Sequence, residues 1–217
     1  MPPGKVQEFA NQTVAYVQRA LGLTLEYDSD TLPILDHYLR EVPRDRPETL
    51  ELVVLTSAAY FGEVVRRRLG GRWELGDEPR SWQLVLPSGI RFTPAGLTAA
   101  AIAMSEVAEV DTALDAPARM RPHLHEALQR MGQVTAEEFY SLCGRLDTLE
   151  HLHEVLVSVA AATLGAAGPH ASGEPGDAPD AVDDVADVVA DDDADDAVGS
   201  DGDTDPAHPP DPDPLVN

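Results

Sequence analysis

The segment from Thr49 to Gly71 constrains the fold of this chain more than any other. It reads TLELVVLTSAAYFGEVVRRRLGG, and from Leu52 to Val65 apolar or small residues occupy nearly every position of a helical wheel. This pattern is typical of a helix that its neighbours cover on all sides. Two consecutive glycines can end such a helix in the left-handed conformation. We therefore predict a buried central helix over residues 49–69, ended by Gly70 and Gly71.

Glu63 is the one charged residue inside the apolar part of this helix. A carboxylate in an apolar setting must pair with a cation, take up a proton or reach water. Arg67 is the favoured partner at i,i+4, and Arg91 and Arg145 are alternatives. Buried carboxylates can also serve as general acids or bases. Glu63, together with Tyr60, is thus the candidate catalytic group, and a purely structural ion pair is the competing interpretation.

After Gly71 the apolar period changes from 3.6 to 2. Apolar and polar residues alternate over 73–75, 82–86 and 90–92, with turn residues between these segments. The alternation predicts a three-stranded antiparallel meander with one apolar face, which the central helix would cover. Trp73 and Trp82 fall on these strands, where they either line a ligand cleft or pack in the core.

Helical periodicity predicts the remaining elements, with a short edge strand at 23–27 between the first two helices. Ser29 or Asp30 is expected to cap the second helix, and Thr135 opens the last one with a capping box. That last helix has a predicted inward stripe of Phe139, Leu142, Leu146, Leu149, His153, Leu156 and Ala160. The helices are expected near 5–21, 31–42, 94–110, 117–131 and 135–160. The predicted class is α+β: a small antiparallel meander packed on a central buried helix and surrounded by further helices.

Charge is distributed unevenly along the 217 residues. Of the 39 acidic residues, 16 follow Gly165, whereas all 15 Lys and Arg precede it, so the two regions carry net charges of −8 and −16. The second region consists mainly of Ala, Asp, Val, Gly and Pro, a composition that predicts disorder. We expect a globular domain over 1–165 and a disordered acidic tail over 166–217. The acidic balance argues against direct nucleic-acid or membrane binding and favours a basic partner protein.

Several classes of protein are disfavoured by what the sequence lacks. It contains no phosphate-binding loop, dinucleotide fingerprint, serine elbow or HExxH motif, so no cofactor is expected. The single cysteine, Cys143, excludes an internal disulfide and suits a reducing compartment. The first residues lack the layout of a signal peptide, and no apolar run approaches the ~20 residues of a membrane helix. The expected location is the cytoplasm.

Two further groups of residues are candidates for binding. Glu150 and His153 have the Glu-x-x-His spacing of di-iron helical bundles, although a second such pair is needed there, so they are weak metal candidates. The competing interpretation is a histidine satisfied by hydrogen bonds. Arg66 and Arg67 belong to a basic cluster that could hold an anion or the acidic tail. A charged helix end, favoured by the helix dipole, is the simpler alternative.

The chain resembles a family of uncharacterised bacterial proteins that carry an AYxGEVxRR…GGxW…W…FxPxG signature. The matching residues are 59–67, 71–73, 81–84 and 92–96, with 138–140 and 145–149 resembling the closing segment of that family. The resemblance covers most of residues 50–155. It implies no activity, but it does imply that a set of residues belongs to a shared domain design: Tyr60, Gly62, Glu63, Arg66, Trp73, Trp82, Pro94 and Gly96.

Three functions remain compatible with the sequence. The leading hypothesis is a non-enzymatic protein-interaction module of the adaptor or scaffold type, in which the globular part recognises another bacterial protein. The second is a small enzyme or ligand-binding domain centred on Glu63, Tyr60 and an arginine. The third is mimicry of nucleic-acid charge by the acidic tail. An enzyme requires an open pocket at Glu63, whereas an adaptor should show an exposed apolar patch.

Overall fold

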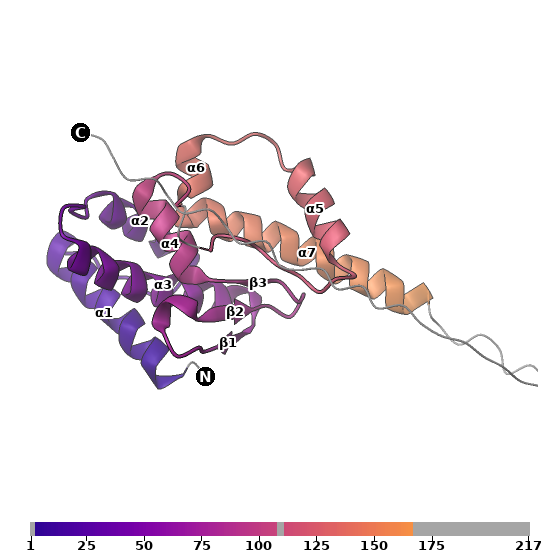
Figure 1. The fold of residues 1–217 in the computed structure, drawn as a ribbon, viewed down its shortest axis with the longest axis horizontal. Coiled ribbons are helices and arrows are strands. Elements are labelled where there is room, and N and C mark those ends of the chain that lie inside the picture. The colour runs from indigo at the N-terminus through magenta and orange to yellow at the C-terminus, as the bar shows by residue number, and fades with distance from the viewer. Residues whose placement is uncertain (1–2, 108–110, 167–217) are drawn as a thin grey trace, which may run out of the picture. The chain divides into compact units, whose positions relative to one another are not determined.

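The structure is a computed structural model that describes residues 3–107 and 111–166. These residues form helices and a three-stranded antiparallel sheet, which confirms the predicted α+β class (Figure 1). The predicted disordered tail lies outside the described residues apart from Ala166. The helix predicted over residues 94–110 is too long, because the observed helix ends at Ala103 and Met104 follows it with a φ of 54°. Residues 108–110 of that prediction lie outside the described residues.

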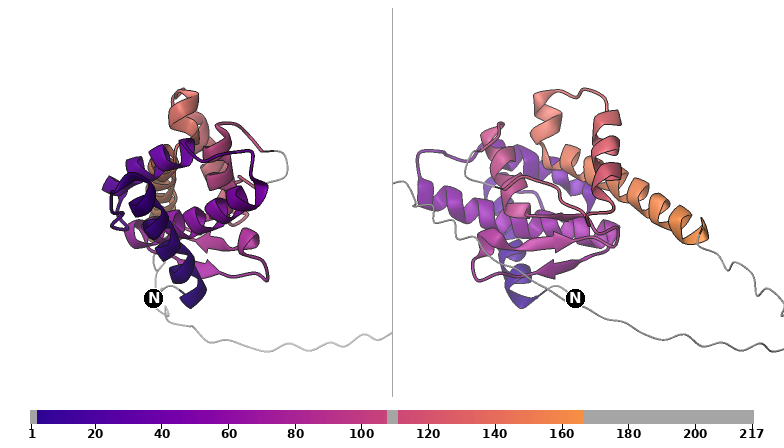
Figure 2. Two further views of the ribbon diagram at one scale, coloured as in Figure 1. Left: turned by 90° about the vertical axis from the view of Figure 1, so that its left-hand side faces the viewer. Right: turned by 45° about the vertical axis from the view of Figure 1, so that its right-hand side comes forward.

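Helix α3, Pro47–Leu69, is the central element of the fold. It contacts α1 (Gly4–Leu21), α4 (Pro94–Ala103) and α7 (Leu142–Ala166) (Figures 1 and 2). Every residue from Thr56 to Val65 is buried. Gly70 follows the helix with a φ of 75°, a value that favours glycine. The predicted central helix is therefore confirmed, with its start two residues earlier than expected.

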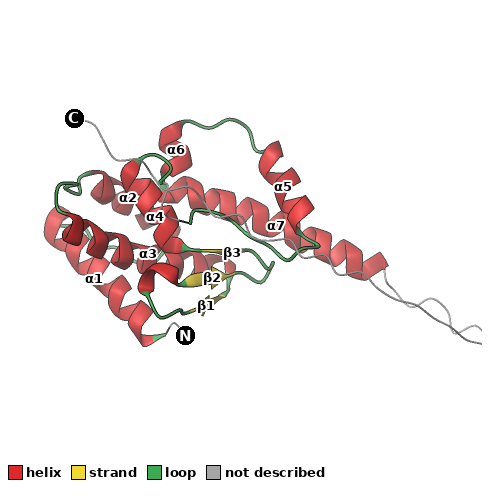
Figure 3. Cartoon of the chain, in the orientation of Figure 1, coloured by secondary structure: helices red, strands yellow, loops and turns green. Residues whose placement is uncertain are grey.

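The predicted meander is also present. Strands β1 (Arg72–Glu74), β2 (Gln83–Val85) and β3 (Arg91–Phe92) pair in that order, all antiparallel (Figure 3). Leu84 lies opposite Trp73 on one side and Phe92 on the other. Because Leu84 and Phe92 are buried, this row forms the apolar face of the sheet.

The strand predicted at residues 23–27 is absent, because this segment has no regular secondary structure. Tyr27 has a φ of 60°, which a strand cannot accommodate, and its N–H donates to the Tyr60 hydroxyl at 2.9 Å. The predicted cap is wrong as well. Asp28, rather than Ser29 or Asp30, accepts the Thr31 N–H and opens the short 3-10 turn that leads into α2, Leu32–Arg40.

The last predicted helix is divided into α6 (Ala136–Tyr140) and α7. The capping box at Thr135 is confirmed, but Ser141 adopts an extended conformation between the two helices. The Ser141 hydroxyl accepts the Gly144 N–H, and the carboxylate of Asp36 accepts the N–H groups of Leu142 and Cys143 at 2.7 and 3.1 Å. These contacts start a new helix where the sequence pattern alone predicts continuity.

Helix α5 spans Arg121–Arg130, and the segment from α5 through α6 arches over α7 (Figures 1 and 2). The break at Ser141 changes which face of α6 points inward. Phe139, predicted to lie on the buried stripe, is 43% exposed, whereas Leu142, Leu146, Leu149 and Leu156 are buried as expected. Of the helices in the described ranges, none combines the length and the apolar content that crossing a bilayer requires.

Candidate functional site

Glu63 is completely buried, and both oxygens of its carboxylate accept hydrogen bonds. Arg66 donates from Nε to Oε1 at 2.8 Å and from a terminal nitrogen to Oε2 at 3.0 Å, while Trp73 Nε1 donates to Oε1 at 2.7 Å. The prediction that Arg67 pairs with Glu63 is wrong. Arg66, at i,i+3 on the same helix, makes the bidentate ion pair with Glu63 instead. Such two-point pairing is the strongest arrangement that arginine offers a carboxylate.

Trp73 joins β1 to α3 at this point. Its indole lies directly against Gly62, where an added Cβ would overlap the ring. Gly62 therefore permits the close approach that brings the indole N–H to Glu63. We refer to Gly62, Glu63, Arg66 and Trp73 as the α3–β1 junction.

Tyr60, the second catalytic candidate, is buried on the same helix but its hydroxyl is used elsewhere. It accepts the Tyr27 N–H and lies 3.0 Å from the Thr31 hydroxyl. Burial raises the pKa of Tyr60 above its usual value, and the two hydrogen bonds oppose that rise. Tyr60 and Glu63 share no hydrogen-bond partner among the described residues, so the structure does not combine them into one acid–base pair.

The remaining basic residues near the end of α3 are matched within the fold. Arg67 lies over the Tyr27 ring, with 4.3 Å from its guanidinium carbon to the ring centroid. Arg68 pairs with Glu150 at 2.8 Å, and Arg72 pairs with Glu74 at 2.7 Å. This internal matching favours the charged-helix-end interpretation over an anion site.

Trp82 packs in the core, and its edge also lines a cavity. It is 5% exposed, stacks on Phe9 of α1 with ring centroids 5.5 Å apart, and donates from Nε1 to the Gly76 carbonyl at 3.2 Å. Its indole thus connects α1 to the sheet, as Trp73 connects α3 to it. A cavity of about 410 Å³ touches its edge.

The two residues proposed as metal ligands, Glu150 and His153, each contact a different side chain. Glu150 pairs with Arg68, and His153 Nδ1 lies 3.0 Å from the Ser88 hydroxyl. No cluster of three or more His, Cys, Asp or Glu suitable for a metal occurs within residues 3–107 and 111–166. Cys143 is half-buried, and burial, reinforced by the neighbouring Asp36 carboxylate, raises its pKa to about 12. The thiol is therefore protonated at neutral pH and is a poor nucleophile.

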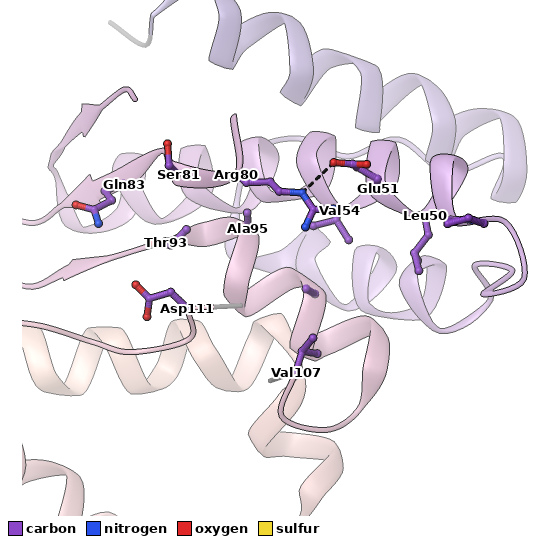
Figure 4. A pocket seen from close by; sticks show the side chains of 12 residues that line it. Leu50, Glu51, Val54, Arg80, Ser81, Gln83, Thr93, Ala95, Val107 and Asp111 are labelled. Carbon is purple, nitrogen blue, oxygen red and sulfur yellow. Dashed lines mark hydrogen bonds and ion pairs between the residues drawn. The ribbon is translucent and has the colours of Figure 1, made fainter. Parts of the chain in front are cut away.

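Figure 4 shows a cavity of about 570 Å³ between α3, the segment before β2 and α4. Its charged residues are Glu51, Arg80 and Asp111. Arg80 pairs with Glu51 at 2.9 Å, with both side chains about half exposed, and Asp111 accepts the Ala113 N–H. The described lining contains no His, Cys or Lys, and Glu63 and Tyr60 are not part of it.

A second cavity, of about 520 Å³, lies beneath the arch formed by α5, α6 and the loop between them. Its apolar lining includes Leu114, Leu128, Met131, Val134 and Phe139. Helix α7 contributes Cys143, Gly144, Arg145, Asp147 and Thr148. Leu128, Val134 and Phe139 are 38, 55 and 43% exposed. We call this cavity and its apolar rim the arch groove. Its volume falls within the range of about 300–1,000 Å³ that is common for ligand sites.

Sequence reasoning missed the arch groove and the role of Asp36. Phe139 and Leu128 fit helical stripes in the sequence, and only the break at Ser141 leaves Phe139 exposed. Asp36 binds backbone N–H groups more than a hundred positions away, which no local pattern could indicate. A signal existed at Ser141-Leu142, since a serine before an apolar helical run is a common helix start.

Comparison with known proteins adds no assignment: no family model matches the chain, and neither a curated protein nor a solved structure is significantly similar to it.

Proposed function

We propose that this protein is a non-enzymatic protein-interaction module, and that the arch groove is the surface that binds its partner. The partner is a bacterial protein whose apolar segment enters the groove. The net charge of −24 favours partners with a basic surface around that segment, because long-range attraction speeds their encounter.

One observation carries this proposal. Three large apolar side chains, Leu128, Val134 and Phe139, are each more than a third exposed around a single cavity. Exposed apolar side chains are ordinary when scattered but mark interaction sites when they gather at one place. A partner that covered them would gain the free energy of removing this apolar surface from water.

The competing enzyme hypothesis has less support from the geometry. Glu63 is closed off from solvent, and both of its oxygens are taken by Arg66 and Trp73. A general acid or base must come within hydrogen-bond reach of a substrate. Charge mimicry depends on residues outside the described ranges, so the fold supplies no observation in its favour.

Site-specific photo-crosslinking tests the proposal. A photoreactive phenylalanine analogue at Val134 should crosslink a discrete partner in bacterial cells, because Val134 lies on the groove rim. The double substitution L128S/F139S should strongly reduce this product, since it removes the apolar rim on either side of the probe. The yield is measured by mass spectrometry against the unsubstituted chain.

A probe at Leu75 provides the matched control, because Leu75 is 42% exposed but lies outside the arch groove. The L128S/F139S change should leave Leu75 products unaltered. Two outcomes would show that the groove is not the binding surface. One is that the probes at Val134 and Leu75 crosslink the same partner with equal yield, and the other is that the Val134 crosslink persists in the double variant. Circular dichroism of the double variant should match that of the unsubstituted chain, since the changed side chains lie at the rim.

A further inference from the structure

Arg145 is the one basic residue among the described residues that line the arch groove. It lies in the first turn of α7, and its guanidinium carbon is 4.0 Å from the centroid of the Phe139 ring and 5.8 Å from that of Tyr140. Both distances are within the range of a cation–π contact. The groove thus contains a cation that lies over two aromatic rings.

This cation is incompletely satisfied. Arg145 Nε is buried and has no hydrogen-bond partner among the described residues. Burial lowers the pKa of Arg145 from its usual value, with a smaller opposing effect from Tyr140 and Glu106. A buried donor without an acceptor is unfavourable. The terminal nitrogens of Arg145 likewise make no hydrogen bond or ion pair with the described residues, and they are the donors that an anion in the groove would meet.

The two acids on the groove lining do not fill this role. Glu138 is held by Thr135, whose N–H and hydroxyl lie 3.1 Å from its carboxylate as part of the capping box. Asp147 is exposed to solvent. The acceptor that Arg145 lacks can therefore come from a ligand.

Building on the proposed function, we propose that the partner segment in the arch groove carries a carboxylate that pairs with Arg145, beside apolar side chains that contact Leu128, Met131 and Val134. The planar fork of arginine matches a carboxylate at two points. A phosphorylated segment fits less well, because phosphate-reading sites gather several arginines, whereas the described lining of this groove supplies one. The segment is thus acidic at one position and apolar around it.

Selection from a library of short randomised peptides displayed on phage tests this inference with the full chain as the immobilised target. The groove-specific pool consists of the peptides that bind the unsubstituted chain but do not bind the L128S/F139S variant. This pool should be enriched in sequences that place Asp or Glu next to apolar residues. A synthetic peptide from the pool should lose about 10- to 100-fold in affinity when its acid is changed to the amide, which is the range for a hydrogen bond to a charged group.

Substitutions at Arg145 complete the test. R145M should lower the affinity for the acidic peptide by the same factor and leave the affinity for the amide peptide unchanged. The protein change and the peptide change together should therefore reduce the affinity no more than either change alone. R145K retains the charge without the planar fork and should recover only part of the affinity. Both variants should fold, because R145M removes a buried donor that lacks an acceptor.

The outcomes separate the two proposals. A groove-specific pool without acidic enrichment, or equal binding of acid and amide peptides, would overturn the carboxylate pairing and leave the interaction module standing. Acidic peptides that bind R145M as tightly as the unsubstituted chain would also overturn the carboxylate pairing. Failure to obtain any pool that distinguishes the unsubstituted chain from L128S/F139S would count against the groove as a protein-binding surface.

Discussion

At residue 63 the fold encloses a carboxylate with no access to water, and it is stable there because Arg66 and Trp73 supply three hydrogen bonds. Removing one partner of a buried ion pair leaves the other charge uncompensated and typically costs about 3–5 kcal/mol. We expect E63A to lower the free energy of unfolding by about that amount. Chemical denaturation followed by tryptophan fluorescence measures the change.

The matched control is E51A, which breaks the exposed pair with Arg80 and should cost at most about 1 kcal/mol. W73F should fall between them, since it removes a single hydrogen bond to a charged acceptor, worth about 1.5–3 kcal/mol. If E63A were as stable as E51A, the α3–β1 junction would not be the structural centre that its geometry indicates.

Cys143 provides a second prediction at the scale of one residue. Its pKa of about 12 leaves the thiol protonated throughout the ordinary pH range. Because the thiolate is the reactive form, iodoacetamide should modify the native protein slowly at pH 8 and the unfolded protein much faster. Mass spectrometry of timed samples measures both rates. Similar rates in the two states would show that the thiol is neither buried nor perturbed by Asp36.

At the scale of elements, the start of α7 depends on a side chain from α2. Asp36 accepts the N–H groups of Leu142 and Cys143, which have no partner within their own helix. D36A should lower the free energy of unfolding by about 3 kcal/mol, because it removes hydrogen bonds to a charged acceptor and leaves buried donors unpaired. D36N should cost less, since its amide oxygen still accepts.

Hydrogen exchange localises this effect. In D36A the amides at the start of α7 should exchange faster, while those in the middle of α3 keep their relative protection. Uniform acceleration across both helices would mean that Asp36 contributes to global stability without acting on the start of α7.

The contact between Gly62 and Trp73 couples α3 to β1. In an isolated helix, alanine would be favoured over glycine by about 1 kcal/mol. Here a Cβ at Gly62 overlaps the indole, and overpacking of this kind costs about 1–3 kcal/mol. We expect G62A to be destabilising by thermal denaturation and W73L to relieve part of the loss in the double variant. A stabilising G62A would contradict the close approach.

The elements that sequence predicted correctly are those whose own residues determine them. The apolar surface of α3 and the alternation in the meander are periodic signals, and burial follows from them directly. The failures occur where a distant contact decides the local conformation. Tyr60 holds Tyr27 out of a strand, and Asp36 starts α7 after Ser141. The candidate site shows the same limit of local sequence patterns. The sequence identified Glu63 and Arg66 as candidate residues, but it did not predict that they form a bidentate ion pair.

At the scale of the whole molecule, the core is closed by the described residues themselves. The buried apolar cluster runs from Val6 on α1 to Leu156 on α7, and α3 lies in its middle. A chain that ends at Ala166 should therefore fold, with a free energy of unfolding within about 1 kcal/mol of the full chain at high salt, as for changes that leave the core intact. At low salt it should be equally or more stable, since removing the 16 acidic residues of the tail reduces self-repulsion. Denaturant titrations at two ionic strengths measure both effects. A loss of several kcal/mol, or a transition that is no longer cooperative, would show that residues 167–217 complete the domain.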